Sequence, residues 1–342
     1  MERLISLFRS HFGEEPSEVT ALPLSGSSRR YFRMAARGRS AVACKGSTRA
    51  ENEAFFAISA AMCSQGLNAP RVLAVSPDRM DYLQEDLGDC QLFGALESEL
   101  ADGNFSPVKM GWIRSTVAAL PAVQHLTGKA LDWSICFPDR EFNRRMVSFD
   151  LNYFKYDFLK LITVPFDEIR LQDDLDRLSE DALKPFGDTF MYRDFQARNI
   201  MIRNSEPWFI DFQGGRRGPA QYDLASFLWN AGTHFSRSLR EELEGIYLDA
   251  LDRFCKIDIR QWEQDYHTMI LLRLLQEAGA YGYRGIVERK SLFLECIPSL
   301  LGFFSEVGDK ACARYPYLGS LLEGTSAHWD GSTLIPEFSV KL

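Results

Sequence analysis

The chain has 342 residues, 46% of them hydrophobic and 25% charged, which is ordinary for a globular protein. That length exceeds what one hydrophobic core usually holds, so we expect two lobes or domains. The formal net charge of -8 argues against a general nucleic-acid binder and against a protein that binds anionic membranes, although a local basic pocket stays compatible with it.

The first quarter of the chain is predicted to be mostly β-structure. Residues 1–12 have the spacing of a short amphipathic helix. Two strands follow on either side of a turn rich in Gly and Ser, and a third strand ends in a lysine. A helix and two further strands complete this part. After the first helix, the expected elements are 20–24, 31–35, 40–45, 51–65, 69–75 and 80–85.

Beyond residue 88 the pattern becomes helical, interrupted by a compact polar and β-rich segment at 189–211. Strands first and helices later predict an α+β fold. We expect a small β-rich N-lobe over residues 1–86 and a larger, mainly helical C-lobe over 87–342. The helices expected in the second part are 112–126, 139–160, 169–183, 222–232, 239–254 and 262–280.

Targeting and redox features favour a cytoplasmic protein. The N-terminus has acidic residues early and no long apolar run, so we expect no secretory signal. We expect no membrane span either, because the most apolar helical candidate, 269–275, is interrupted by Arg273. The seven cysteines are scattered and lack a C-x-x-C pair, which is typical of reduced thiols rather than of disulfides or zinc ligands.

The most informative segment holds Asp194, Asn199 five residues later, and Asp211 at the end of an apolar strand. Phosphoryl transfer needs these groups: one carboxylate to orient the attacking hydroxyl and accept its proton, and a carboxylate with an amide oxygen to hold Mg²⁺. A hairpin between them would bring all three to one end of a small sheet. An aspartate and an asparagine at this spacing also occur by chance in surface turns, so the intervening strand and Asp211 carry the interpretation.

Tyr192-Arg193-Asp194 with Asn199 resembles the catalytic loop of protein kinases, and the residues around Asp211 resemble their metal-binding motif. The sequence is more similar to the aminoglycoside phosphotransferase family, and within it to the cell-wall sugar kinases that phosphorylate the anomeric hydroxyl of N-acetylmuramate and N-acetylglucosamine. The stretches that carry this second likeness are 24–33, 51–55, 210–228 and, more loosely, 273–283.

The resemblance implies a two-lobed, protein-kinase-like fold that uses ATP and Mg²⁺. It implies that Asp194 is the catalytic base and that Asn199 and Asp211 hold the metal. Asp223 is expected to support the catalytic-loop backbone, although an aspartate at a helix start is also simply a good cap. Two positions depart from the family: Tyr192 and Gln196 stand where it has histidines, and we expect both beside the acceptor.

On the nucleotide side, Lys45 ends a strand that is similar to the lysine-bearing strand of kinases, and Glu53 is its expected partner, with Glu51 in reserve. An exposed lysine at a strand end is the alternative. The backbone of Glu85 and Leu87 is expected to pair with the adenine edge. The turn expected to cover the phosphates, or else to be a plain hairpin turn, consists of Ser25, Gly26, Ser27 and Ser28.

On the acceptor side, Arg216 and Arg217 are candidates for an anion clamp, because the planar fork of arginine fits a carboxylate or phosphate. Exposed loop arginines are the alternative. The aromatic stretch 149–158 is expected to line the acceptor pocket or to be an ordinary buried helix face. The sequence therefore predicts a kinase of a small hydroxyl compound, foremost an amino sugar. An aminoglycoside, choline-like or other metabolite kinase and a silent nucleotide-binding regulator are the alternatives.

Overall fold

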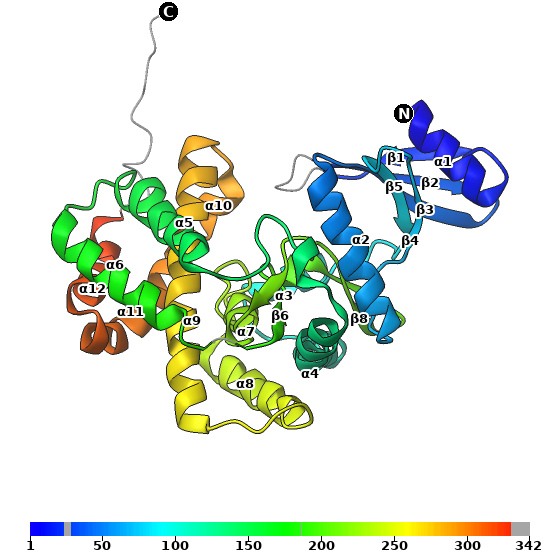
Figure 1. Cartoon of the computed structure of the whole chain (residues 1–342). Helices are drawn as coiled ribbons and strands as arrows, with labels where there is room; N and C mark the ends of the chain where they lie inside the picture. The colour runs from blue at the N-terminus through cyan, green and yellow to red at the C-terminus, as the bar shows by residue number, and fades with distance from the viewer. Residues whose placement is uncertain (24–28, 186, 330–342) are drawn as a thin grey trace, which may run out of the picture. The chain divides into compact units, whose positions relative to one another are not determined.

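The computed structural model describes residues 1–23, 29–185 and 187–329 (Figure 1). Contacts along the chain divide it into two compact units. The first comprises Met1–Glu141, Gly187–Asp223 and Leu243–Cys255, and the second comprises Phe142–Phe186, Leu224–Glu242 and Lys256–Leu342, each as far as its residues are described. The turn predicted at Ser25, Gly26, Ser27 and Ser28 lies outside the described residues.

The first unit begins with helix α1 (Glu2–Phe12) and contains a five-stranded antiparallel sheet in the order β1-β2-β3-β5-β4. A helix, α2 (Arg49–Ser64), lies in the chain between the third strand and the fourth. Strands and helix match the predicted elements to within a few residues at each end. The strands are β1 (Glu18–Ala21), β2 (Arg30–Ala36), β3 (Arg39–Lys45), β4 (Val72–Val75) and β5 (Asp81–Glu85).

The two faces of this sheet pack against different helices, which decides which side chains face the site. Because residues alternate between faces along a strand, Ala41 and Ala43 of β3 lie on the face covered by α1, in one core with Leu4 and Phe8. Figure 1 shows α1 against the sheet. We name this the outer face, and the face that carries Val42, Cys44 and Tyr82 the inner face.

On the inner face, Phe55 of α2 stacks on Tyr82 of β5, with ring centroids 5.1 Å apart. The same Phe55 ring lies parallel to Phe212, also at 5.1 Å. Helix α2 therefore contacts both the sheet and the segment that follows Asp211, and such aromatic pairs contribute about 0.5–1.5 kcal/mol each beyond their buried area.

The rest of the first unit holds two small two-stranded sheets and two helices. Strand β7 pairs with β8, and β6 pairs with β9. Backbone hydrogen bonds tie β7 and β8 to the segments that flank the N-terminal sheet: Ile202 N–H donates to Cys90 O at 2.7 Å, and Phe209 N–H donates to Asn68 O at 2.9 Å. The elements are α3 (Leu92–Leu100), α4 (Pro107–Ala130), β6 (Thr189–Met191), β7 (Ile200–Arg203), β8 (Glu206–Phe209) and β9 (Arg216–Gly218).

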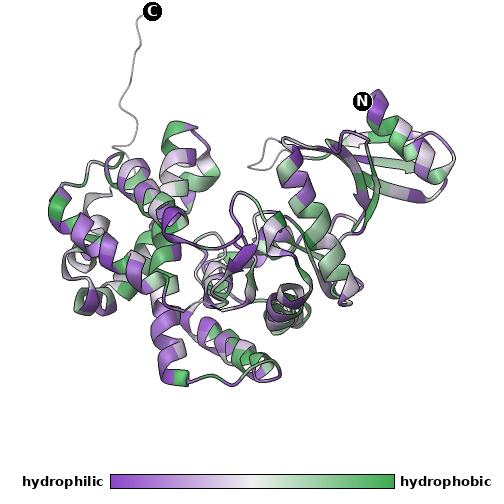
Figure 2. Cartoon of the chain, in the orientation of Figure 1, coloured by the Kyte–Doolittle hydropathy of each residue, from purple (hydrophilic) through white to green (hydrophobic). Residues whose placement is uncertain are grey.

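The second unit is helical. Helix α5 starts at an Asn143 cap, whose side-chain oxygen accepts from Met146 N–H at 3.2 Å, and continues into a π-helical turn at Lys155–Leu159. Figure 2 shows hydrophobic and hydrophilic residues alternating around α6 and α8. The helices of this unit, with two that pass from one unit to the other along the chain, are α5 (Arg144–Phe154), α6 (Glu168–Ala182), α7 (Gln221–Leu228), α8 (Arg237–Leu251), α9 (Ile259–Tyr281), α10 (Ser291–Glu295), α11 (Ile297–Arg314) and α12 (Pro316–His328).

The predicted α+β fold class is confirmed, while the boundary at residue 86 stays a prediction. Among the described residues, one helical stretch, Ser291–Arg314, is long and apolar enough to cross a membrane by length and composition alone, a test that core helices also pass. Within it Leu300 and Phe304 are fully buried, as in a core helix. We expected the most apolar helix at 269–275 instead.

Candidate active site

The side chain of Asp223 holds the backbone of the loop between β6 and β7. The carboxylate of Asp223 accepts the N–H of Tyr192 and the N–H of Arg193, both at 2.9 Å, and the side-chain amide of Gln124 at 2.9 Å. Asp223 is fully buried, and burial raises its pKa to about 7 while these three donors oppose that rise. A carboxylate with three N–H donors fixes the backbone just before Asp194.

Two non-glycine residues of the site have left-handed backbone conformations. The φ angle is +81° at Arg193 and +66° at Asp211. Such conformations cost about 1–3 kcal/mol each and persist only where the surrounding structure over-determines them. The hydrogen bonds to Asp223 hold the backbone of Arg193 in this conformation. For Asp211, the constraint is the pairing of β7 with β8, which ends two residues before it.

The β7–β8 hairpin brings Asn199 and Asp211 to one end of a small sheet with Asp194, as predicted. Asn199 donates its side-chain N–H to Asp194 O at 2.8 Å, and its own backbone carbonyl accepts Ile210 N–H at 3.1 Å. With its nitrogen so used, the Asn199 amide oxygen is left as an acceptor. Asp194 is half-buried, and no described residue donates a hydrogen bond to its carboxylate.

The Asp211 carboxylate accepts from Gln213 at 2.9 Å. Its pKa is raised, chiefly by burial; the Gln213 hydrogen bond and the charge of Arg29 lower it, and the charges of Asp194 and Glu51 raise it. The excess of negative charge favours a cation here. One carboxylate and one amide oxygen fit Mg²⁺, which takes few protein ligands and completes its shell with phosphate oxygens and water.

Tyr192, expected beside the acceptor, is instead fully buried. Its hydroxyl donates to the carbonyl of Ile210, and its ring meets Phe195 edge-on at 5.4 Å. The tyrosine therefore ties the catalytic loop to the residue before Asp211, which is a structural role. Gln196 is half-buried.

We expect Tyr192→Phe to lower the free energy of unfolding by about 1–3 kcal/mol, because the Ile210 carbonyl loses a buried hydrogen bond. Urea denaturation measures the change, and the KM for the acceptor should stay at the wild-type value. A changed acceptor KM with unchanged stability would return Tyr192 to the acceptor site.

A cavity of about 240 Å³ connects the segment after β5 to the metal residues. It is lined by Val42 and Gln84 from the inner face of the sheet, and by Asn199 and Asp211. Glu85 and Leu87 are also among its lining residues; that their backbone pairs with the adenine edge stays a prediction.

The lining segment 85–88 is held by an arginine that sequence reasoning missed. Arg33, on the inner face, makes a bidentate ion pair with Asp86, at 2.8 and 3.0 Å, and also donates to Gly88 O at 2.9 Å. Glu85 pairs with Arg203 of β7 at 2.6 Å. The charged residues in 81–89 were the only signal in this segment, and their pattern does not indicate which residues they pair with.

The structure does not bring Lys45 and Glu53 together as a pair. Lys45 is exposed and shares the outer face with Ala43, since alternation puts it opposite to Cys44. Glu53 hydrogen-bonds Arg79, at 2.6 Å for one of its two contacts, and lies 3.4 Å from Arg49. Val42 lines the cavity from the inner face. The next residue of β3 on that face is Cys44, not Lys45.

The reserve carboxylate, Glu51, lies on the side of α2 that faces the site. It pairs with Arg29 at 3.5 Å, and Arg29 also donates to Asn52 at 3.4 Å. Arg29 is 1% exposed, and Tyr31 two residues later lines the cavity. Sequence reasoning missed Arg29 because it stands next to a turn.

Arg216 does not present an open fork to an anion. It is buried, and its guanidinium donates twice to Gly214 O, at 2.8 and 3.1 Å, so it braces its own loop. Arg217 is half-exposed and pairs with Asp188.

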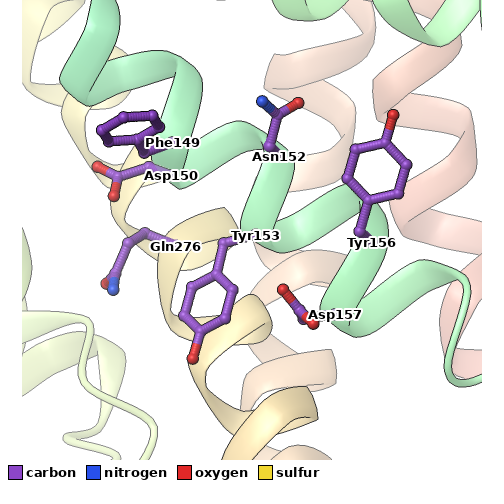
Figure 3. A pocket seen from close by; sticks show the side chains of 7 residues that line it. All are labelled: Phe149, Asp150, Asn152, Tyr153, Tyr156, Asp157 and Gln276. Atoms are coloured by element: carbon purple, nitrogen blue, oxygen red, sulfur yellow. The ribbon is translucent and has the colours of Figure 1, made fainter.

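The second unit carries a hollow of about 470 Å³ where the aromatic stretch was expected to line a pocket. Figure 3 shows six of its side chains on α5 and the following turn, with Gln276 on α9. The turn that follows α9 approaches the turn that follows α5 closely because residue 282 is glycine; a Cβ there would lie 1.8 Å from Asp157 O. The lining residues are Phe149, Asp150, Asn152, Tyr153, Tyr156, Asp157 and Gln276.

The sequence model of the phosphotransferase enzyme family matches residues 18–257, which include the sheet, the cavity and the catalytic loop. The chain belongs to this phosphotransferase family. It is a small-molecule kinase.

Three proteins are similar to this chain in sequence or in fold. An N-acetylmuramate/N-acetylglucosamine kinase of Pseudomonas putida is 27% identical over 329 residues, which are 94% of this chain and 92% of that protein. Choline kinase from Cryptosporidium parvum has a TM-score of 0.60 at 14% identity, covering 94% of this chain and 99% of that one. The streptomycin–ATP complex of APH(2")-IIa has a TM-score of 0.54 at 14% identity, covering 88% and 95%. These structures confirm the protein-kinase-like fold.

Proposed function

We propose that this protein is an ATP-dependent kinase that phosphorylates the anomeric hydroxyl of an amino sugar, N-acetylmuramate or N-acetylglucosamine. The observation that carries the sugar is the full-length likeness to the Pseudomonas putida kinase of those two sugars. The observation that supports the nucleotide is the cavity that joins the 85–87 segment to Asn199 and Asp211.

In this proposal Asp194 is the base. Its carboxylate accepts the proton of the acceptor hydroxyl while that oxygen bonds to the γ-phosphorus, and the bond from that phosphorus to the β,γ-bridging oxygen breaks, which releases ADP. The anomeric hydroxyl is more acidic than an ordinary sugar hydroxyl, so one carboxylate suffices. A histidine at position 192 is not needed, which fits the buried tyrosine there.

Asn199 and Asp211 would hold Mg²⁺, which supplies positive charge to the β- and γ-phosphate oxygens when bound. Asp223 keeps the backbone before Asp194 in place through the N–H groups of Tyr192 and Arg193. Glu85 and Leu87 would offer backbone groups to the adenine edge.

The hollow of the second unit suits a polyhydroxyl compound, because carboxylates and side-chain amides there can bind hydroxyls and the tyrosines can pack on a sugar ring. The same hollow also favours a second candidate acceptor, a choline-like or other cationic alcohol. Asp150 and Asp157 are acidic, and Tyr153 and Tyr156 offer ring faces to a cation.

The test is acceptor-dependent release of ADP with purified protein, ATP and Mg²⁺, followed by phosphorus NMR of the product. We expect turnover with N-acetylmuramate or N-acetylglucosamine and a sugar 1-phosphate as product. Choline and an aminoglycoside are the parallel acceptors. Turnover of one of these with no reaction of either sugar would remove the sugar and leave the kinase. For the acidic sugar, Arg217 is the remaining candidate to meet its carboxylate.

A further inference from the structure

A phosphate-binding cation is expected on the inner face of the N-terminal sheet, and Lys45 does not supply it. Kinases hold the α- and β-phosphates with a fixed cation that is paired to a carboxylate of the following helix. Here the inner-face position of β3 is Cys44, and burial raises the pKa of its thiol to about 11, so it is neutral at neutral pH. The role has to be filled by another residue.

We propose that Arg29 is the residue that binds the nucleotide phosphates, with Glu51 as its orienting carboxylate. This inference rests on the proposed function as an ATP-dependent kinase. Arg29 directly precedes β2, and its contacts with Glu51 and Asn52 of α2 put its side chain on the same side as Tyr31, which lies opposite Cys44 in the β2–β3 register. The guanidinium thus comes from the segment just before β2, near the inner-face position of β3 that Cys44 occupies.

The surroundings of Arg29 are those of a fixed cation rather than of a surface arginine. Its side chain is fully buried, while that of Glu51 is 20% exposed, and the two are 3.5 Å apart. Asn52 of the same helix accepts from the guanidinium at 3.4 Å and is itself fixed by donating to Arg79 O and Met80 O, at 2.9 and 3.0 Å. Helix α2 therefore orients the guanidinium through two adjacent residues.

Arg29 adjoins the cavity along the chain. Tyr31, two residues after it, lines the cavity together with Asn199 and Asp211. A planar fork at this place can bind two phosphate oxygens at once, which an ammonium cannot do in the same fixed geometry. The chemical class that it recognises is the diphosphate part of a nucleoside di- or triphosphate.

The test compares the binding of ADP with Mg²⁺ and of adenosine, by calorimetry, in wild type and variants. We expect Arg29→Gln and Arg29→Ala to weaken ADP binding about 10- to 100-fold, as for the loss of a charged hydrogen bond, and to leave adenosine binding within about threefold. Lys45→Ala is the matched control and should bind ADP like wild type. Adding Cys44→Lys to Arg29→Ala should recover at least about tenfold, because it restores an inner-face cation.

Thermal unfolding verifies that each variant is folded. A folded Arg29→Gln protein that binds ADP like wild type overturns the proposal, and so does an equal loss for ADP and adenosine. Lys45→Ala changes an exposed side chain, so it can be measured even if the Arg29 variants do not fold. A tenfold loss of ADP affinity in Lys45→Ala would return the phosphate-binding role to Lys45. Wild-type protein that binds no ADP would instead refute the proposed function.

Discussion

Asp211→Asn should abolish turnover, by at least about 10³-fold in kcat, and leave the protein folded. The substitution keeps the size of the side chain and its contact with Gln213, but removes the negative charge that would hold the metal against the phosphates. A metal ion contributes several kcal/mol of transition-state charge stabilisation, and each 1.36 kcal/mol is a factor of about ten in rate.

Steady-state release of ADP measures the loss, and a Mg²⁺ titration of ADP binding supplies the second readout, because the variant should lose the metal-dependent part of the affinity. Asp102→Asn is the matched control: Asp102 is exposed, and its substitution should change neither quantity. A folded Asp211→Asn protein with near-normal activity would contradict the metal assignment.

Asp194→Asn should lower kcat by about 10²–10⁴-fold, the range that a positioned general base contributes. Nucleotide affinity should stay within about threefold of wild type, because the residue acts on the acceptor hydroxyl and the cavity lining does not include it. The backbone carbonyl that receives Asn199 is unchanged by the substitution.

Different measurements therefore distinguish the two variants. Asp194→Asn should lose rate and keep metal and nucleotide binding, whereas Asp211→Asn should lose both rate and metal-dependent nucleotide binding. Kinetics for Asp194→Asn come from ADP release, and binding comes from calorimetry. Equal loss of Mg²⁺-dependent ADP affinity in both variants would mean that Asp194 acts as a metal ligand rather than as the base.

The sequence was sufficient for the catalytic segment because its groups are local. Asp194, Asn199 and Asp211 flank one hairpin, β7–β8, so spacing and strand pattern already bring them together. The contacts of Asp223 likewise fall on the loop that resemblance indicated. The catalytic segment does not depend on how distant elements pack, whereas Asp223 reaches the loop from α7, 30 residues after Arg193, and only the resemblance indicated its role.

The nucleotide side could not be predicted in the same way, because it depends on which face of β3 is covered. The strand reads Ala41-Val42-Ala43-Cys44, four small apolar residues without alternation, and all four are buried. Only the packing of Leu4 and Phe8 of α1 on Ala41 and Ala43 settles the faces. A shift of one residue moves every side chain to the other face, and with it the lysine.

The helices after residue 290 were missed although signals were present. Both α11 and α12 have a proline in their first turn, Pro298 and Pro316, which is typical of a helix start.

The stacked rings of Phe55 and Phe212 bear on regulation. In protein kinases the helix that carries the carboxylate is moved toward or away from the nucleotide, and its position switches the enzyme on or off. Here that helix is fastened by a ring-on-ring contact, inclined by only 4°, to the residue that follows Asp211. Moving α2 would require separating the pair, so we expect a constitutively active metabolic enzyme whose flux follows the supply of its substrates.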